Sequence, residues 1–286
     1  MALVTLKEIL KESIEKKYAV GAFNTFDHTI TEAILAGAEA KGKPVIINVG
    51  WFSSIPHCDL YFKYMIMRCE ASSVPVCINL DHGPSFEEAM KAIHYGCTSV
   101  MIDGSSLPFS ENVALTKKVV EAAHACGVSV EAEIGHVAGH KGDMMGGQVA
   151  DETKFTKLED AVRFAEETGI DALAIAIGTV HGVYKGEPKL DYDRITAIRN
   201  AVSIPLVMHG GSGLAAEQYK EAVACGINKI NYATYMMLGA GEAMIKFVEE
   251  RSRKLLSQEI VAVGSKRISE IVSEQIENFG TQALTL

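Results

Sequence analysis

The sequence predicts an α/β protein with the (β/α)8 fold, a TIM barrel with additional C-terminal helices. Three observations support this prediction. Short apolar runs alternate with amphipathic stretches eight times, the runs are apolar throughout, and glycine closes several of the amphipathic stretches. Continuous apolar runs are typical of strands buried on both faces of a parallel sheet. Strand–helix alternation repeated eight times is the pattern of a closed barrel.

The eight expected strands share this apolar character and lie at 19–23, 44–49, 75–80, 98–102, 128–134, 171–177, 204–209 and 227–231. Helical spacing of apolar residues marks the stretches between them, such as SFEEAMKAIHYG and KLEDAVRFAEETG. Both of these end in Gly, which can end a helix and lead directly into a strand. A doubly wound open sheet is the structural alternative, but no GxGxxG follows the first expected strand, and that disfavours it.

We expect one domain over residues 1–286, with 236–286 as a helical extension that contains KFVEERSRKLL and ISEIVSEQIENF. This length is normal for one α/β barrel. The first residues, MALVTLKEILKESIEKK, carry charges throughout and predict an amphipathic helix rather than a secretory signal.

Composition limits the classes of partner. With 48% hydrophobic residues, 22% charged residues and a net charge of −9, the chain is expected to bind neither nucleic acid nor membrane as a general partner. Its longest apolar runs are too short to span a bilayer. The six cysteines form no CxxC pair, so we expect free thiols and a cytoplasmic location.

Three histidines follow three different expected strands, and chemistry in a barrel gathers at the carboxyl ends of the strands. They are His82, His181 and His209. Each histidine alone is more often structural, but three on one rim can converge on one ion. Neutral imidazoles are common zinc ligands. Three protein ligands leave the fourth coordination position of the zinc open for substrate. Other polar residues expected at these strand ends are Asn24, Asp81, Asp103, Glu131, Glu133 and Asn231.

Two segments, the glycine-rich HGGSG at 209–213 and the polar INYAT at 230–234, follow the last two strands, where barrels commonly bind phosphate. Turns need glycine anyway, but two adjacent segments with polar side chains predict an anion site. The HGVYKGEP loop adds a glycine and a lysine to it. The residues expected at the substrate and its phosphate are Asn24, Gly182, Lys185, Gly210, Gly211, Ser212, Asn231, Ala233 and Thr234.

The ordered segments NLDHG, SVMIDGS, VEAEIG, AIGTVHGVYKGEP, LVMHGGSG and KINYAT resemble the class II fructose- and tagatose-bisphosphate aldolase family. The resemblance runs from about AVGAFN to INYAT. It implies reversible cleavage of a ketose phosphate to dihydroxyacetone phosphate and an aldehyde, with one catalytic Zn²⁺. It also implies a monovalent cation (Na⁺ or K⁺) near Gly182 and Gly210, and a homodimer or homotetramer.

The same resemblance assigns roles to individual residues. It implies that His82, His181 and His209 are the zinc ligands, and that Asp81 is the acid that protonates the aldehyde oxygen on condensation. Adjacent residues at a strand end diverge, which suits separate roles for Asp81 and His82. Three further carboxylates are implied around the metal: Glu133 as an alternate carboxylate on the metal side, and Asp103 and Glu131 as residues that orient the ligands. A Lewis-acidic zinc can then stabilise the charge that aldol cleavage leaves behind, where a Schiff-base enzyme would use a lysine.

Three departures from the family pattern bear on the substrate. The loop after the fifth strand, GHVAGHKGDMMGG, lacks the usual acidic cluster, so either His140 or Asp143 transfers the second proton or the loop is only a flexible lid. Fructose-bisphosphate aldolases carry Asp where this chain has Ala233, as tagatose-type relatives do. No Arg aligns near 262–264 to hold a distal phosphate, and only Lys266 and Arg267 lie close by.

We therefore expect an aldolase for a ketose 1-phosphate or a ketose 1,6-bisphosphate, with tagatose- or fructose-1,6-bisphosphate aldolase proper as the alternative. Another metal-dependent barrel enzyme would keep the histidines but would not need the paired phosphate segments. A non-catalytic paralogue would not need to keep Asp81 and all three histidines. The fold alone does not decide between these functions.

Overall fold

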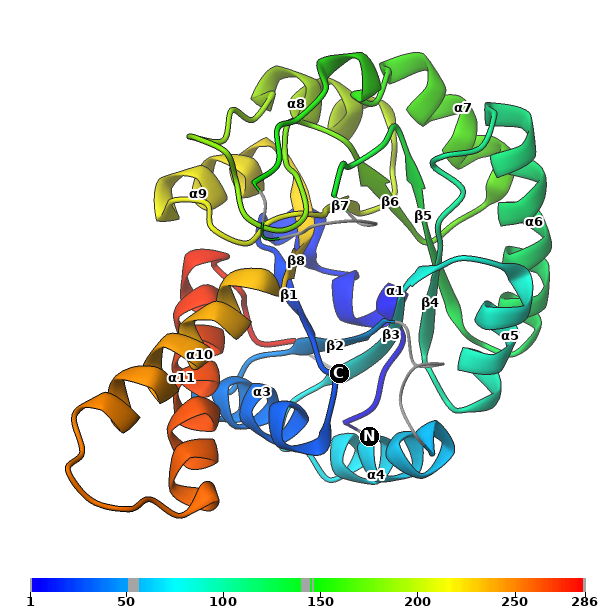
Figure 1. Ribbon diagram of the computed structural model, residues 1–286. Helices are drawn as coiled ribbons and strands as arrows, with labels where there is room; N and C mark the ends of the chain where they lie inside the picture. The colour runs from blue at the N-terminus through cyan, green and yellow to red at the C-terminus, as the bar shows by residue number, and fades with distance from the viewer. Residues whose placement is uncertain (1, 51–56, 140–144, 146, 285–286) are drawn as a thin grey trace.

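The structure is a computed structural model that describes residues 2–50, 57–139, 145 and 147–284 (Figure 1). Within these residues, eight parallel strands pair in chain order and close between the last and the first, which confirms the predicted (β/α)8 barrel. The strands are β1 (Val20–Asn24), β2 (Val45–Val49), β3 (Val76–Gly83), β4 (Ser99–Ile102), β5 (Ser129–Ile134), β6 (Ala172–Ile175), β7 (Leu206–Met208) and β8 (Ile227–Tyr232).

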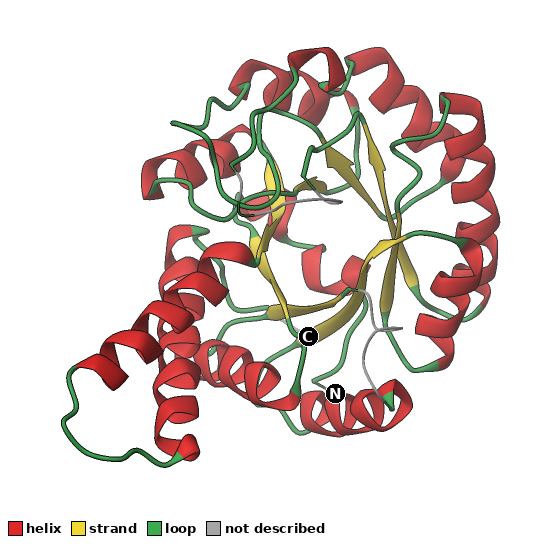
Figure 2. Ribbon diagram, viewed as in Figure 1, coloured by secondary structure: helices red, strands yellow, loops and turns green. Residues whose placement is uncertain are grey.

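Helices surround the strands as an outer ring (Figure 2). Most strand side chains are buried. The outward-facing strand residues pack against the helices in one large apolar cluster. The helices of the ring are α3 (His28–Lys41), α4 (Cys58–Glu70), α5 (Phe86–His94), α6 (Phe109–Ala125), α7 (Leu158–Thr168), α8 (Tyr192–Ala201), α9 (Ala216–Cys225), α10 (Thr234–Glu249) and α11 (Ser257–Asn278), with a short 3₁₀ turn η2 (Glu152–Lys154) before α7.

The N-terminal segment closes one end of the barrel. It forms two short helices, α1 (Leu6–Leu10) and α2 (Ser13–Lys16), where the sequence predicted one. Thr5 and Glu8 form a capping box at the start of α1. Leu6, Ile9 and Leu10 recur at i, i+3 and i+4 and pack on the apolar side chains that fill the barrel interior. Polar chemistry is therefore left to the opposite end, where the strands point.

The C-terminal extension is helical, as predicted, but its boundaries differ. The segment KFVEERSRKLL is not one helix, because α10 ends at Glu249 and a loop runs to Leu256 before α11 begins. This loop lies at the far end of the α10–α11 pair, away from the barrel (Figure 1). Most of its side chains are exposed, so no buried surface favours continued helix there. Among the described residues, no helix combines the length and apolar composition needed to cross a membrane.

Candidate metal centre and substrate pocket

A pocket opens at the carboxyl ends of the strands and collects most of the residues expected at the site. None of its described lining residues is a lysine or an arginine. Phe26 and Gly50 also line it, and no sequence pattern pointed to either. The lining residues are Asn24, Phe26, Gly50, Asp81, His82, His181, Gly182, Gly210, Ser212, Asn231, Ala233 and Thr234.

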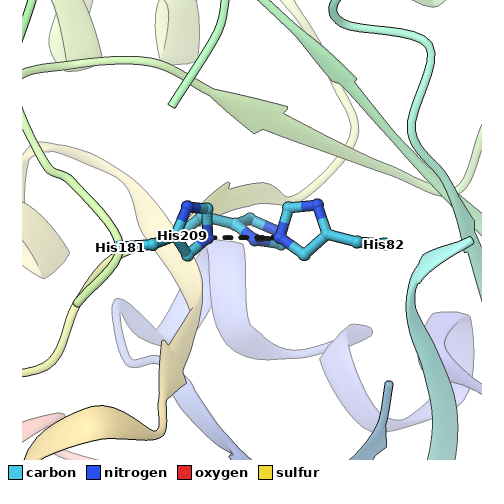
Figure 3. Close-up of side chains that lie close together, drawn as sticks. All are labelled: His82, His181 and His209. Atoms are coloured by element: carbon cyan, nitrogen blue, oxygen red, sulfur yellow. Dashed lines mark hydrogen bonds between the residues drawn. The ribbon is translucent and has the colours of Figure 1, made fainter. Parts of the chain in front are cut away.

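The three predicted histidines converge on one point: His82 lies on β3, and His181 and His209 lie in the segments after β6 and β7 (Figure 3). His82 Nε2 lies 3.2 Å from His181 Nε2 and 2.9 Å from His209 Nδ1. In a tetrahedral zinc site with Zn–N bonds of about 2.0–2.1 Å, two ligand nitrogens are roughly 3.3 Å apart. The observed spacing is close to this value, so the three side chains fit one small divalent ion.

Each imidazole is oriented by the partner of its other nitrogen. His82 Nδ1 lies 2.8 Å from Asp103 Oδ2, and His181 Nδ1 lies 3.3 Å from the Ala138 carbonyl oxygen. His209 is turned the other way, with Nε2 at 2.8 Å from Glu131 Oε1. Since carboxylates and carbonyls only accept, these partners take the N–H of each ring. In the neutral form of each ring, the lone pairs of His82 Nε2, His181 Nε2 and His209 Nδ1 face one point.

Asp81 and His82 lie within β3, which extends to Gly83, three residues beyond its expected end. Side chains of consecutive strand residues normally point to opposite faces, so the sequence predicted that these two diverge. Both line the same pocket, because the pairing with β4 shifts register between Leu80 and Gly83 and His82 has a φ of 49°. At Gly83 an added Cβ would lie 2.5 Å from the Met101 carbonyl oxygen, so this bulge requires glycine.

The Asp81 carboxylate is held by two amides. Asn24 Nδ2 donates to Oδ2 at 2.8 Å, and Asn231 Nδ2 donates to Oδ1 at 3.0 Å. Burial alone raises the pKa of Asp81, but nearby positive charge, His82 first, and the Asn24 hydrogen bond outweigh it and lower the pKa below its usual value. Asp81 is therefore an ionised carboxylate with two fixed donors.

Glu133 lies in a second group, with His82 and Asp103, whose ligand atoms are all within 4.8 Å of one another. Its Oε1 accepts the Val137 N–H at 3.1 Å, and its Oε2 is buried without a hydrogen-bond partner among the described residues. Burial, and then the charge of Asp103, raise the pKa of Glu133 to about 8. An unpaired buried oxygen beside a metal-facing histidine fits its predicted position on the metal side.

The turn after β7 packs closely against the segment that follows β6. Gly210 has a φ of 64°, and any Cβ there would overlap the backbone of Val180. Tyr184 Oη donates to the Gly210 carbonyl oxygen, and Tyr219 Oη donates to that of Gly211, each at 2.6 Å. These two tyrosines, which the sequence did not indicate, fix the turn after β7.

The end of β8 is tied to the turn after β7. The Ser212 hydroxyl accepts the Ala233 N–H at 2.8 Å, and α10 begins directly after it without a side-chain cap. The first turn of α10 therefore faces the pocket with backbone N–H groups, an arrangement that favours an anion.

Three residues that the sequence placed at the phosphate either hydrogen-bond to other groups or lie outside the pocket. The Gly211 N–H donates to the Asn231 carbonyl oxygen at 3.2 Å, so this donor is already used. The Asn231 side chain is engaged with Asp81 and with Lys229. Lys185 is exposed and does not line the pocket.

The two remaining expectations concern the loop after β5 and the distal phosphate. His140 and Asp143 lie outside the described residues. Arg267 lies on α11 and pairs with Glu274 at 2.9 Å, and Lys266 is on the same helix; neither lines the pocket.

The barrel interior also holds a buried charged residue that no sequence pattern indicated. Lys229 lies within β8, completely inaccessible to solvent, and its Nζ is 2.8 Å from Glu131 Oε2 and 2.6 Å from Asn231 Oδ1. The only sequence signal is a lysine inside the apolar run INKIN. A lysine rarely occupies such a position unless it is paired.

Comparison with known proteins agrees with this geometry. The family model described as "Fructose-bisphosphate aldolase class-II" matches residues 4–283. The chain is 40% identical to a fructose-bisphosphate aldolase of Geobacillus stearothermophilus, covering 98% of both chains. It is 39% identical to a probable fructose-bisphosphate aldolase of Bacillus subtilis (strain 168), covering 98% of this chain and 99% of the relative.

Among solved structures, the YdjI aldolase of Escherichia coli K12 is similar, with a TM-score of 0.86, 32% identity and 98% coverage of both chains. Family match, sequence identity and fold all cover nearly the whole chain. The chain therefore belongs to the class II fructose-bisphosphate aldolase family.

Proposed function

We propose that this aldolase reversibly cleaves a ketose 1-phosphate or ketose 1,6-bisphosphate to dihydroxyacetone phosphate and an aldehyde, with His82, His181 and His209 holding one Zn²⁺. The observation that carries the proposal is the convergence of these histidines beside Asp81 in a pocket that also reaches the turns after β7 and β8. Bound there, zinc supplies a Lewis acid that polarises the substrate carbonyl.

Asp81 moves the proton in this proposal. Its lowered pKa keeps it ionised at neutral pH, so in the cleavage direction it can accept the hydroxyl proton of the substrate. In condensation it returns that proton to the aldehyde oxygen. Asn24 and Asn231 each donate to one carboxylate oxygen, which fixes the plane of the carboxylate. Asp103 and Glu131 act through the imidazoles, and Glu133 remains the proposed alternate carboxylate on the metal side.

The phosphate of the dihydroxyacetone phosphate half is proposed to bind between Gly182, Gly210 and Ser212 and the first turn of α10. Backbone N–H groups and the positive end of a helix dipole favour such an anion. A monovalent cation is proposed nearby, on carbonyl oxygens around Gly182 and Gly210. A second phosphate would require another cation at the pocket, and none of the described lining residues is Lys or Arg. This supports the ketose 1-phosphate over the bisphosphates.

We further propose one catalytic domain that assembles as a homodimer or homotetramer and works in the cytoplasm. The location is supported by the cysteines, which are free thiols at all six positions.

The direct test is a screen of aldehydes with dihydroxyacetone phosphate, using metal-depleted protein with and without added zinc. Zinc-dependent condensation with an unphosphorylated aldehyde is the expected result. Condensation that is equally fast without zinc would contradict the metal assignment. Activity only with glyceraldehyde 3-phosphate would contradict the preference for a ketose 1-phosphate and leave a ketose 1,6-bisphosphate as the substrate.

A further inference from the structure

Lys229 lies buried in the barrel interior and is not among the described residues that line the pocket. It stands in a continuous series of contacts that runs from a metal-facing histidine to the proton-transfer carboxylate. His209 Nε2 contacts Glu131 at 2.8 Å, and Glu131 contacts Lys229 Nζ at 2.8 Å. Lys229 Nζ then contacts Asn231 Oδ1 at 2.6 Å, and Asn231 Nδ2 contacts Asp81 Oδ1 at 3.0 Å.

We propose that Lys229 is a positioning residue that sets both halves of the active site at once: the orientation of the Asn231 amide on Asp81, and the ring orientation of His209 through Glu131. The proposal deepens the proposed function and rests on it for the roles of Asp81 and His209. The contacts themselves involve only side chains of this chain.

The contact of Lys229 with Asn231 orients the Asn231 amide. An ammonium group has donors only, so the amide atom that faces Lys229 must be the oxygen. The NH₂ group is then forced toward Asp81, whose ionised carboxylate needs a donor. The same nitrogen lies 3.3 Å from His209 Nδ1. If Lys229 is removed, the Asn231 amide oxygen loses its donor, and the Asp81 carboxylate alone must then hold the amide in this orientation.

The contact of Lys229 with Glu131 acts on the His209 ring. Glu131 is completely buried, and its two oxygens contact different partners: Oε1 lies 2.8 Å from His209 Nε2, and Oε2 lies 2.8 Å from Lys229 Nζ. The contact with Lys229 fixes the position of the Glu131 side chain and keeps Oε1 directed at His209. Oε1 accepts the N–H of His209 Nε2, which leaves Nδ1 facing the other two histidines. Through this one intervening carboxylate, Lys229 holds the tautomer of His209 that can bind a metal.

The test compares Lys229→Met, which keeps the length and removes the donors, with a matched control. Asp171→Ala is that control, because Asp171 is also a buried charge, paired with His124 and Lys7 before β6 and outside the pocket. Three quantities are measured for each protein: the zinc dissociation constant by chelator competition without substrate, kcat and KM for aldol cleavage, and the thermal midpoint.

For Lys229→Met we expect zinc binding weakened about 10- to 100-fold and kcat lowered about 10- to 100-fold with KM little changed. Asp171→Ala should lower only the thermal midpoint. A Lys229→Met protein that matches this control, with zinc affinity and kcat intact, would show that Lys229 is only a counter-ion.

The double variant Lys229→Met/Glu131→Gln separates the effect on the Asn231 amide from the effect on the His209 ring. It also removes the carboxylate that Lys229→Met leaves without its partner, so it can be tested even if the single variant does not fold. The introduced amide oxygen can still accept from His209, and zinc affinity and the thermal midpoint should recover. Asn231 still lacks its donor, so kcat should stay low; full recovery of kcat would overturn the amide half. Because zinc affinity is measured without substrate, a protein that binds zinc as expected but cleaves no ketose phosphate would count against the proposed function and not against the His209 half.

Discussion

Asp81 and His82 are consecutive residues of one strand, yet both side chains line the same pocket. The bulge between Leu80 and Gly83 and the left-handed backbone of His82 make this possible. A proton-transfer carboxylate and a metal-facing imidazole are therefore adjacent without a loop between them. The close approach of Gly83 to β4 is the structural condition for this arrangement.

The first prediction concerns that glycine. Gly83→Ala would place a methyl group 2.5 Å from the Met101 carbonyl oxygen, so the bulge must shift. We expect the free energy of unfolding to fall by about 1–3 kcal/mol, together with a clear loss of activity. Chemical denaturation and a steady-state assay measure both. Gly241→Ala is the control, because its added Cβ meets nothing within 4 Å; equal effects in the two variants would contradict the role of the bulge.

The second prediction concerns the metal. His209→Ala removes one of three convergent nitrogens, so elemental analysis of the purified variant should find strongly reduced zinc. His94→Ala, on the exposed side of α5, should retain it. Exhaustive chelation of the unaltered protein should abolish turnover. Unchanged zinc in the His209 variant would refute the assignment of this ligand.

The third prediction separates proton transfer from metal binding. Asp81→Asn is nearly isosteric but cannot accept the proton. We expect normal zinc content and a kcat lower by about 10²- to 10⁴-fold. If zinc is lost in proportion to activity, Asp81 instead supports His82.

The fourth prediction is the pH dependence of zinc binding. Burial by itself lowers the pKa of His82, but Asp81, Asp103 and Glu133 outweigh it and raise the pKa to about 9. His82 is therefore protonated at neutral pH in the metal-free protein and must lose a proton to bind zinc. The pKa of His209 lies well below its usual value, because burial and then the charge of His82 lower it, so His209 is already neutral.

Zinc affinity should accordingly rise with pH, by about tenfold per unit for one released proton, and level off above about pH 9. Ionisation of Glu133, whose pKa is raised to about 8, acts in the same direction. Competition titrations between about pH 6.5 and 9.5 would measure the slope. An affinity independent of pH in this range would be inconsistent with a protonated His82.

The fifth prediction concerns substrate choice. A charge-assisted phosphate contact contributes about 1.5–3 kcal/mol, or roughly ten- to a hundredfold in affinity. Since no described Lys or Arg lines the pocket, a ketose 1-phosphate should be cleaved at least as efficiently as fructose 1,6-bisphosphate. Steady-state kcat/KM values for the two substrates decide the matter, and a preference for the bisphosphate above about tenfold would reveal a distal phosphate site.

Much of this protein could be predicted from the sequence, because the features involved are local or periodic. Apolar runs at regular intervals predicted the eight strands. The histidines at or shortly after the ends of three of these runs, His82, His181 and His209, were predicted to form one cluster. Helix ends were harder. Whether KFVEERSRKLL forms one helix depends on what its side chains pack against. From Glu250 to Leu256 most side chains are exposed, so no buried contact favours a helix there.

The tertiary structure alone decided the contacts between residues far apart in the chain. Lys229 on β8 meets Glu131 on β5, although β6 and β7 lie between these strands, and Asn231 meets Asp81 across 150 positions. No period or motif encodes such a contact, because it depends on closure of the barrel and on which strand faces which. The sharing of one pocket by Asp81 and His82 was likewise hidden, since the alternation rule predicts divergence and only the register shift beside β4 reverses it.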